Sequence, residues 1–286
     1  MHGLTASQLL GYPLDARLLI INADDFGMCH AVNQAIVGTL EAGVVRSTSL
    51  MVPCPGTAEA IHFLAEHREI PFGVHLTAIS DSFHNRWQPL TAREKVPSLL
   101  DEQGYFYDFD HMPAFMARVR LDQLAAEFRA QIETVLAAGL QPAHLDWHSL
   151  RIRDRVDIFD LIFRLAREYG LALRVAYQPW INRLQDQGLP FNDYETLDSY
   201  LLDPAAKAAR FAALLRALPP GLSEWAVHPG LDSAELLALE PGGSGIRQAD
   251  FDFLTSREAK ELVREESITL LDYRALQAVW KHTPSA

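Results

Sequence analysis

The sequence has few of the features that would place it outside ordinary globular proteins. Only two of its 286 residues are cysteines, Cys29 and Cys54, and no CxxC pair occurs. This scarcity argues against a disulfide-stapled secreted fold and favours a reducing compartment. No apolar run is long enough to span a bilayer, and no basic region precedes the first apolar residues. We therefore expect a cytoplasmic protein without membrane insertion.

Basic residues are also scarce. The chain has 25 Lys and Arg against 37 Asp and Glu, a formal net charge of −12. No nucleic acid is expected as a partner, since a polyanion would be repelled by such a chain. The length allows two domains or one α/β barrel, and the composition leaves a homodimer open.

Short apolar runs alternate along the chain with helical patterns. These runs read as buried on both faces, which is typical of a parallel sheet covered by helices. Seven strands in β-α order approach the eight of a complete barrel, so we expect an α/β fold, a distorted or incomplete (β/α) TIM-like barrel in a single domain. The expected strands are 18–22, 46–52, 72–77, 143–148, 171–176, 224–228 and 268–271, and the expected helices are 30–42, 56–68, 119–138, 155–169, 204–217 and 256–266.

Three segments interrupt this alternation. Residues 78–118 and 177–203 read as loop insertions, and loops this long inside a domain usually form lids or binding walls. Their aromatic residues could stack on a sugar or could simply pack the loops. The Gly-rich stretch "EPGGSGIRQADFDF", residues 240–253, is expected to be a third loop.

The segment 143–148 carries the strongest signal for chemistry. On a strand, His144, Asp146 and His148 share one face, because successive side chains alternate. Three such groups are costly to bury without partners, and a parallel sheet solvates neither face. The pattern favours a metal or reaction centre over a hydrogen-bonded set at a strand end.

Two further histidines lie on expected strands. His75 shares a face with Gly73 and Thr77, and taken alone it is equally compatible with a ligand or with a locally satisfied core residue. His228 shares a face with Glu224 and precedes a Pro-Gly turn. Sites in α/β sheets and barrels are assembled at this carboxyl end of the strands.

The adjacent acids Asp24 and Asp25 follow the run that ends at Asn22. We expect the chain to leave the strand there, so that both carboxylates bend towards the same rim. Asp and His suit zinc and similar divalent ions, and a second carboxylate beside such an ion can act as a general base on water. The alternative is that one acid caps the following helix, which leaves the other unexplained.

The ordered set "NADDFG", "GVVRSTSLMVP", "GVHLT", "HLDWH" and "VHPG" resembles the YdjC-like carbohydrate deacetylases, which include chitooligosaccharide and hopanoid-biosynthesis deacetylases. The resemblance covers about residues 17–275. It implies a distorted (β/α) barrel and a hydrolase that removes an N-acetyl group from an amino sugar or a chitooligosaccharide-like substrate, releasing acetate. One divalent metal ion, Zn or Mg, is the implied cofactor.

The resemblance also assigns roles by position. The implied catalytic residues are Asp24 as general base, His228 as general acid, and Arg174 as the basic partner of the catalytic carboxylate. The implied metal ligands are Asp25, His75 and His148.

One run departs from the family pattern. Members often show D-S-H-x-H, whereas this chain has Asp146-Trp147-His148-Ser149-Leu150. The first histidine is kept and the later one is absent, so a ligand at the later position would be missing here. Trp147 replaces a small residue, which indicates different local packing.

Two other functions compete with deacetylation. Asp/His sites on barrels serve many reactions, so a phosphoester hydrolase is one alternative. The scarcity of basic residues near the motifs counts against an anionic substrate, with Arg46, Arg174 and Arg247 as the exceptions. A sugar-binding relative without turnover is the other alternative, and the altered DWHSL run is its main support.

Overall fold

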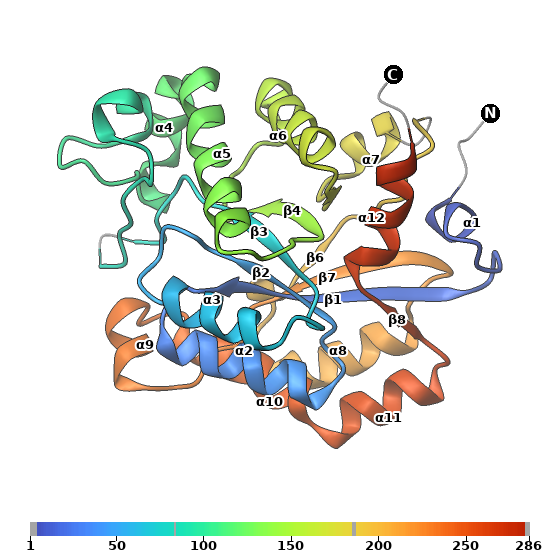
Figure 1. The fold of residues 1–286 in the computed structure, drawn as a ribbon. Coiled ribbons are helices and arrows are strands. Elements are labelled where there is room, and N and C mark those ends of the chain that lie inside the picture. Colours follow the sequence, from blue (N-terminus) through green and yellow to red (C-terminus); the bar gives the residue numbers. More distant parts are fainter. Residues whose placement is uncertain (1–4, 83, 185–186, 284–286) are drawn as a thin grey trace.

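The computed structural model describes residues 5–82, 84–184 and 187–283, and it contains one curled parallel sheet wrapped by helices (Figure 1). The strand order is β5-β4-β3-β2-β1-β7-β6, and β8 pairs with β1. Every strand pairing is parallel, as the buried apolar runs predict. The strands are β1 Arg17–Phe26, β2 Ser47–Leu50, β3 Phe72–Leu76, β4 His144–Trp147, β5 Ala172–Leu173, β6 Leu197–Asp198, β7 Gly221–Val227 and β8 Thr269–Leu271.

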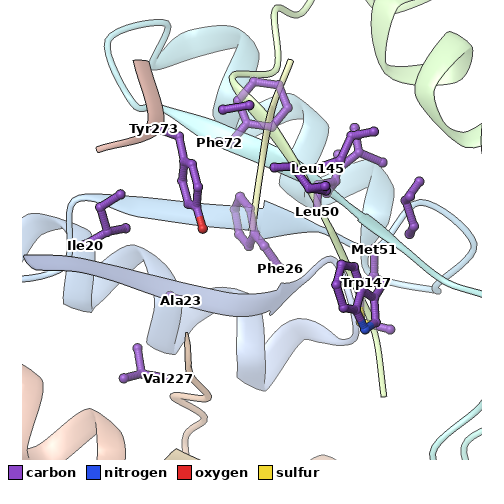
Figure 2. Packing of buried hydrophobic residues seen from close by; sticks show 14 of the residues in the cluster. Ile20, Ala23, Phe26, Leu50, Met51, Phe72, Leu145, Trp147, Val227 and Tyr273 are labelled. Carbon is purple, nitrogen blue, oxygen red and sulfur yellow. The ribbon is translucent and has the colours of Figure 1, made fainter. Parts of the chain in front are cut away.

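Strand β1 organises the sheet because it is the longest and is buried from Leu18 to Phe26. One of its edges pairs with β7 over residues 17–23. The other edge pairs with β8 over residues 18–20 and then with β2 from Asn22 onward. The apolar side chains of this strand and its neighbours, including Phe26, Leu50 and Leu145, pack together around the sheet (Figure 2).

The two ends of the strand order, β5 and β6, meet without a ladder of backbone hydrogen bonds among the described residues. A side chain takes the place of the ladder: Asn192 accepts from the Val175 N–H at 3.2 Å and donates to the Val175 carbonyl at 2.7 Å. One backbone bond, from the Thr196 N–H to the Ala176 carbonyl at 3.4 Å, crosses the same seam. The expectation of a distorted barrel is confirmed, and this seam is one place where the barrel is irregular.

Helices surround the curled sheet, with α2, α10 and α11 below the strands and α5 and α6 above them in Figure 1. The six expected helices correspond to α2, α3, α5, α6, α8 and α11. The helices are α1 Ala6–Leu9, α2 His30–Ala42, α3 Thr57–Glu66, α4 Met112–Arg118, α5 Leu121–Ala137, α6 Val156–Tyr169, α7 Gln178–Leu184, α8 Lys207–Arg216, α9 Ala234–Leu239, α10 Ser244–Thr255, α11 Arg257–Glu265 and α12 Tyr273–His282. None of the described helices is both long and apolar enough to cross a membrane.

The prediction of a loop at 240–253 is wrong, because helix α10 occupies most of it. The inward face of α10 carries Arg247 and Asp250 next to Phe253 and Leu254. Helices are recognised in a sequence by an apolar stripe of period 3.6. Two buried charges interrupt that stripe, so the helix was not visible in the pattern.

The two long insertions are folded segments rather than open loops. Residues 78–118 contain three short 3₁₀-helices, at 93–95, 97–99 and 109–111, and helix α4; residues 177–203 contain α7, β6 and a 3₁₀-helix at 199–201. Residue 83 and residues 185–186 lie outside the described part of these insertions. Trp87, Phe106 and Phe115 are buried, as is Trp180 in the second insertion. Their burial supports packing rather than sugar stacking for these rings.

Candidate active site

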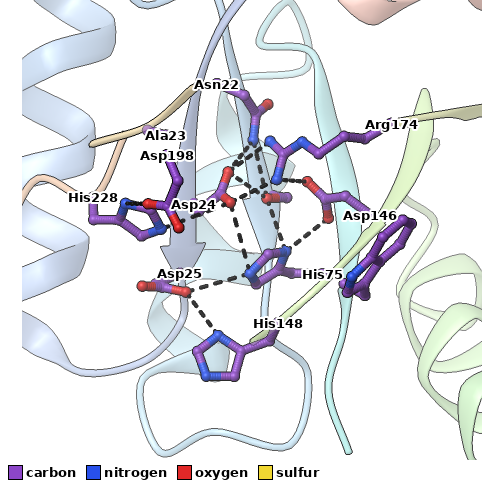
Figure 3. Close-up of polar contacts among 12 residues, drawn as sticks. Asn22, Ala23, Asp24, Asp25, His75, Asp146, His148, Arg174, Asp198 and His228 are labelled. Atoms are coloured by element: carbon purple, nitrogen blue, oxygen red, sulfur yellow. Dashed lines mark hydrogen bonds and ion pairs between the residues drawn. The ribbon is translucent and has the colours of Figure 1, made fainter. Parts of the chain in front are cut away.

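Polar residues gather where the carboxyl ends of β1, β3, β4 and β7 meet (Figure 3). Asp24 and Asp25 come from β1, His75 from β3, and His148 and His228 directly follow β4 and β7. All six site residues predicted from the sequence are in this cluster, since Arg174, just after β5, bonds Asp24. Two surface hollows, one lined by Asp157 and Phe163 and the other by Arg46 and Lys260, include no residue of the cluster.

The sequence analysis placed the end of the first strand at Asn22, and this is wrong, because β1 continues to Phe26. The pairing register of β1 with β2 shifts between Ala23 and Phe26, and Asp25 has a φ of 72°. A bulge with one residue in the left-handed region changes the alternation of side chains, and Asp tolerates that region better than most residues. Both carboxylates therefore face the same cluster despite being adjacent within a strand.

Helix capping does not explain the two acids. Helix α2 starts at His30, and its N-cap residue, Cys29, makes no capping bond with its side chain. The Glu235 carboxylate accepts from the N–H groups of His30 and Ala31 instead, at 3.4 Å and 2.8 Å. The carboxylates are instead used inside the cluster, where Asp24 pairs with Arg174 and Asp25 pairs with Arg247 at 2.8 Å.

Three ligand-type atoms converge in a geometry that could hold a metal ion. Asp25 Oδ1 lies 3.4 Å from His75 Nε2 and 3.1 Å from His148 Nδ1, and the ligand atoms of the three residues lie within 4.8 Å of one another. All three side chains are buried. They are the residues that the family resemblance implies as ligands.

In both His75 and His148, the ring nitrogen that does not face Asp25 also lies against a carboxylate. His75 Nδ1 lies 2.8 Å from Asp146 Oδ1, and His148 Nε2 lies 2.6 Å from Asp81 Oδ1. A carboxylate accepts hydrogen bonds, so it holds the proton on the nitrogen that faces it and leaves the other nitrogen free to bind a metal. This carboxylate–histidine arrangement is the usual second shell of metal-binding histidines.

A second group of residues, Asp24, His75 and Asp146, also has the spacing of a metal site. Arg174 Nη1 lies 2.6 Å from Asp24 Oδ2 and 3.1 Å from Asp146 Oδ2. One guanidinium already bridges the two carboxylates of this group, whereas Arg247 contacts only Oδ2 of Asp25 and leaves Oδ1 facing the two imidazoles. The group with Asp25 and His148 is therefore the better cation site.

The buried charges of the cluster do not balance. Four carboxylates face two guanidiniums, so with all of them ionised the excess reaches two negative charges, which is the charge that a divalent cation supplies. Burying uncompensated charge is costly, so this excess is a physical reason for a cation here. The buried groups are Asp24, Asp25, Asp146 and Glu224 against Arg174 and Arg247.

Without a metal, protons on the histidines take the role of that cation. Burial lowers the pKa of His75, but the carboxylates of Asp146 and Asp24 outweigh it and raise the pKa to about 10. Burial acts in the same direction on His148, where Asp81 and Asp25 raise the pKa to about 9. The cluster therefore attracts positive charge strongly.

Arg174 is buried and binds the Asp24 carboxylate through two hydrogen bonds. It donates to both carboxylate oxygens, at 2.6 Å and 2.8 Å, and its Nε donates to Glu224 at 2.5 Å. Burial raises the pKa of Asp24, but Arg174 and His75 outweigh burial and hold it below its usual value. The Asn22 amide donates to Asp24 Oδ1 at 2.7 Å, so Oδ2 is the less occupied oxygen.

Arg174 is held in turn by a group of buried polar residues, Glu224, Tyr273 and His144. Tyr273 donates to Glu224, the same carboxylate that Arg174 Nε contacts, and burial raises the pKa of Glu224. The Tyr273 ring stacks on His144, with ring centroids 3.6 Å apart. A Cβ on Gly73 would come within 2.4 Å of the His144 ring, so only glycine leaves room for that ring.

His228 lies on the other side of Asp24. Its Nε2 is 3.9 Å from Asp24 Oδ2, the same distance that separates His75 Nε2 from this oxygen. The His228 side chain is 13% exposed, more than any of the three ligand candidates. Asp24 Oδ2 therefore lies between the candidate metal ligands and the more accessible histidine.

The departure from the family run is accommodated by the fold. Trp147 is buried in the hydrophobic core, and its Nε1–H donates to the Leu150 carbonyl at 3.2 Å. Leu150 is buried in the hydrophobic core. The later position of the run thus belongs to the core, whereas His148 contacts Asp25.

The family model described as "YdjC-like protein" matches residues 18–265. The chain belongs to the YdjC-like family. The carbohydrate deacetylase of Enterococcus faecalis is 33% identical to it over 265 residues, which cover 90% of this chain and 97% of the relative. The chitooligosaccharide deacetylase of Yersinia enterocolitica is 28% identical over 264 residues, covering 90% and 98%.

A solved structure from Enterococcus faecalis matches this YdjC-like chain with a TM-score of 0.80 and 31% sequence identity, covering 91% of this chain and 99% of the other. That protein is described as a candidate cellobiose-phosphate cleavage protein. The match supports the fold described above and extends over almost all of it.

Several residues of the site were given no role of their own in the sequence analysis. Asp146 and Glu224 carried a signal, since each shares a strand face with a predicted histidine. Arg247 was noted only as an arginine to watch, and Asp81 carried no pattern because it follows a strand within an insertion. Among the described residues outside the prediction, those that form hydrogen bonds or ion pairs with site residues include Asn22, Ser49, Asp81, Asp146, Asp198, Ser199, Glu224, Arg247 and Asp250.

Proposed function

We propose that this protein is a metal-dependent carbohydrate deacetylase that removes an N-acetyl group from an amino sugar or a chitooligosaccharide-like substrate. The observation that carries the proposal is the convergence of Asp25, His75 and His148 beside Asp24, with His228 on the far side of that carboxylate. The names of the relatives, carbohydrate deacetylase and chitooligosaccharide deacetylase, support the same reaction.

The proposed cofactor is one divalent ion held by Asp25 Oδ1, His75 Nε2 and His148 Nδ1. Two imidazoles and one carboxylate suit zinc better than magnesium, which prefers oxygen ligands. When bound, such an ion supplies Lewis acidity towards an amide carbonyl and towards water.

Asp24 is the proposed general base. Its lowered pKa keeps it ionised at neutral pH, and Oδ2 faces the space between His75 and His228. This oxygen accepts the proton of the attacking water, while Arg174 holds the carboxylate in place from behind.

His228 is the proposed general acid. Its Nε2 gives a proton to the sugar nitrogen as the carbon–nitrogen bond breaks, because an amine leaves poorly without protonation. The products are acetate and a free amino sugar, which together account for the water consumed.

The test combines metal analysis with acetate release. We expect about one equivalent of divalent ion in the purified protein, and acetate release from N-acetylglucosamine, chitobiose or another acetylated amino sugar that stops when the metal is removed. Bound metal with phosphoester hydrolysis and no acetate release would instead support the alternative hydrolase. Sugar binding without metal or turnover would support the non-catalytic alternative.

A further inference from the structure

A buried chain of polar residues lies behind His228, on the side away from Asp24. Ser199, Asp250 and Lys207 have no solvent exposure. Lys207 begins α8, Asp250 lies on α10, and Ser199 begins the 3₁₀-helix that follows β6. None of these residues contacts the proposed metal ligands in the hydrogen bonds and ion pairs described below.

The chain of contacts starts at Lys207. Its ammonium lies 2.9 Å from Asp250 Oδ1 and donates to the Ile246 carbonyl at 3.0 Å. A fully buried ammonium is tolerated only with a charged partner, so the ion pair with Lys207 holds the Asp250 carboxylate in place. The other oxygen, Asp250 Oδ2, accepts from the backbone N–H of His228 at 2.7 Å and from the Ser199 hydroxyl.

The direction of each hydrogen bond then follows from chemistry. An ionised carboxylate can only accept, so the single Ser199 hydroxyl proton points to Asp250. Ser199 Oγ lies 3.2 Å from His228 Nδ1 and has only lone pairs left to offer. The proton between them must therefore belong to His228 Nδ1.

We propose that Ser199 is a positioning residue that, anchored by Asp250 and Lys207, holds His228 in the form with Nδ1 protonated and directs Nε2 towards Asp24. This inference rests on the proposed function, in which His228 Nε2 transfers the proton to the leaving amine. In the neutral ring Nε2 is the only nitrogen without a proton, so it is the nitrogen that takes up the proton later given to the leaving amine.

A neighbouring acid, Asp198, is the competing partner for His228. Its Oδ1 lies 3.7 Å from His228 Nδ1, its side chain is 47% exposed, and the same oxygen accepts from the Tyr200 N–H at 2.9 Å. Ser199 is closer and fully buried. Tyr200 contacts the His228 ring edge-on, with centroids 5.6 Å apart, and offers no hydrogen bond to it among the described contacts.

The first experiment is an NMR measurement of the His228 tautomer in histidine-¹⁵N-labelled protein at alkaline pH, with His228→Gln used to assign the signals. We expect Nδ1–H in the unmodified protein. Ser199→Ala should lose this preference, whereas Ser199→Thr, which keeps a hydroxyl, should retain it. A ring protonated on Nε2 in the unmodified protein would overturn the proposal without the need for any variant.

The second experiment compares an N-acetylated amino sugar with an activated acetyl ester. Ser199→Ala should lower kcat on the amide by about tenfold or more, but by less than the roughly 10²–10⁴-fold that the general acid as a whole contributes. KM should change little, and the loss on the ester should be smaller. Asp198→Asn should change neither the tautomer nor the ratio of the two rates. Equal loss on both substrates, or a larger effect of Asp198→Asn than of Ser199→Ala, would contradict the proposal.

The two experiments separate the inference from the function on which it rests. If no acetate is released from any sugar but the tautomer depends on Ser199, the proposed function fails and the positioning role stands. If acetate is released and the tautomer is unchanged in Ser199→Ala, the function stands and the positioning role fails.

Discussion

The two sides of the site are built from different kinds of element. The proposed metal side takes Asp25, His75 and His148, three residues that could hold a metal ion, from the ends of β1, β3 and β4. The acid side holds His228 with a serine and an acid that come from helical segments far apart in the sequence. Every second residue of a strand lies on one face, so polar residues of a site can be recognised in the sequence of a strand. Buried charged residues on a helix interrupt its apolar stripe, so neither the helix nor its buried charges are recognised in the sequence.

The largest effect is expected on the metal side. His148→Ala removes one of three ligands, so we expect loss of bound metal and at least about a 10³-fold loss of turnover, since a bound ion supplies several kcal/mol. His111→Ala is the matched control, because this exposed histidine pairs with Asp108 outside the cluster. Elemental analysis and acetate release measure both effects; full metal content in the His148 variant would remove it from the ligand set.

Asp24 should separate catalysis from metal binding. Asp24→Asn keeps the shape and a partner for Arg174, which also retains Asp146 and Glu224. The variant should hold its metal and lose about 10²–10⁴-fold in kcat, since the amide cannot accept the proton. Near-normal turnover with metal bound would rule out Asp24 as the base.

On the acid side, the effect should depend on the leaving group. His228→Ala should slow amide cleavage by about 10²-fold or more and slow an activated ester much less, because a good leaving group needs little protonation. Parallel kinetics on the two substrates give this ratio. The same loss on both would indicate a structural role for His228.

Metal binding should release protons from the two histidines of the proposed metal side. The pKa values of about 10 for His75 and about 9 for His148 mean that both rings are protonated at pH 7 without metal, and a metal can bind only the deprotonated forms. Binding at pH 7 should therefore release up to two protons, and fewer as the pH rises through 9 and 10. Calorimetry in buffers of different ionisation enthalpy measures the number, and a release that does not fall with pH would contradict the assignment.

The smallest effects are expected on stability, when a glycine on each side of the site is replaced by alanine. Gly73→Ala places a Cβ against the His144 ring and should lower the free energy of unfolding by about 1–3 kcal/mol through overpacking. Gly245→Ala, in α10, meets no atom within 4 Å and should raise it by up to about 1 kcal/mol through helix propensity. Urea denaturation of both variants checks the contrast, and equal stability of the two would show that the His144 ring can move aside.

The strand-built parts of the molecule were predictable to a useful degree. Each of the seven expected strands has a counterpart in the sheet, and the alternation in 143–148 correctly grouped Asp146 with His148 on the face of the site. The boundary at Asn22 was wrong because a bulge inside β1, and not the end of the strand, turns Asp25 towards Asp24. No residue pattern marks a bulge of this kind.

The helix-built parts were not predictable in the same way. Helix α10 was taken for a loop, although it supplies Arg247 to Asp25 and Asp250 to His228. Lys207 reads in the sequence as an ordinary surface lysine at the start of a helix, yet it is fully buried against Asp250.

The sequence by itself determined the parallel α/β architecture, the family, and the residue types at the strand ends, because apolar periodicity and strand alternation are local properties of a chain. Only the tertiary structure decided which charges meet. The proposed separation of roles between Asp24 and Asp25 depends on two arginines, Arg174 and Arg247, that lie about 150 and 220 residues further along the chain. Such pairings depend on how elements pack, since a buried charge is stabilised by whichever partner the fold brings to it.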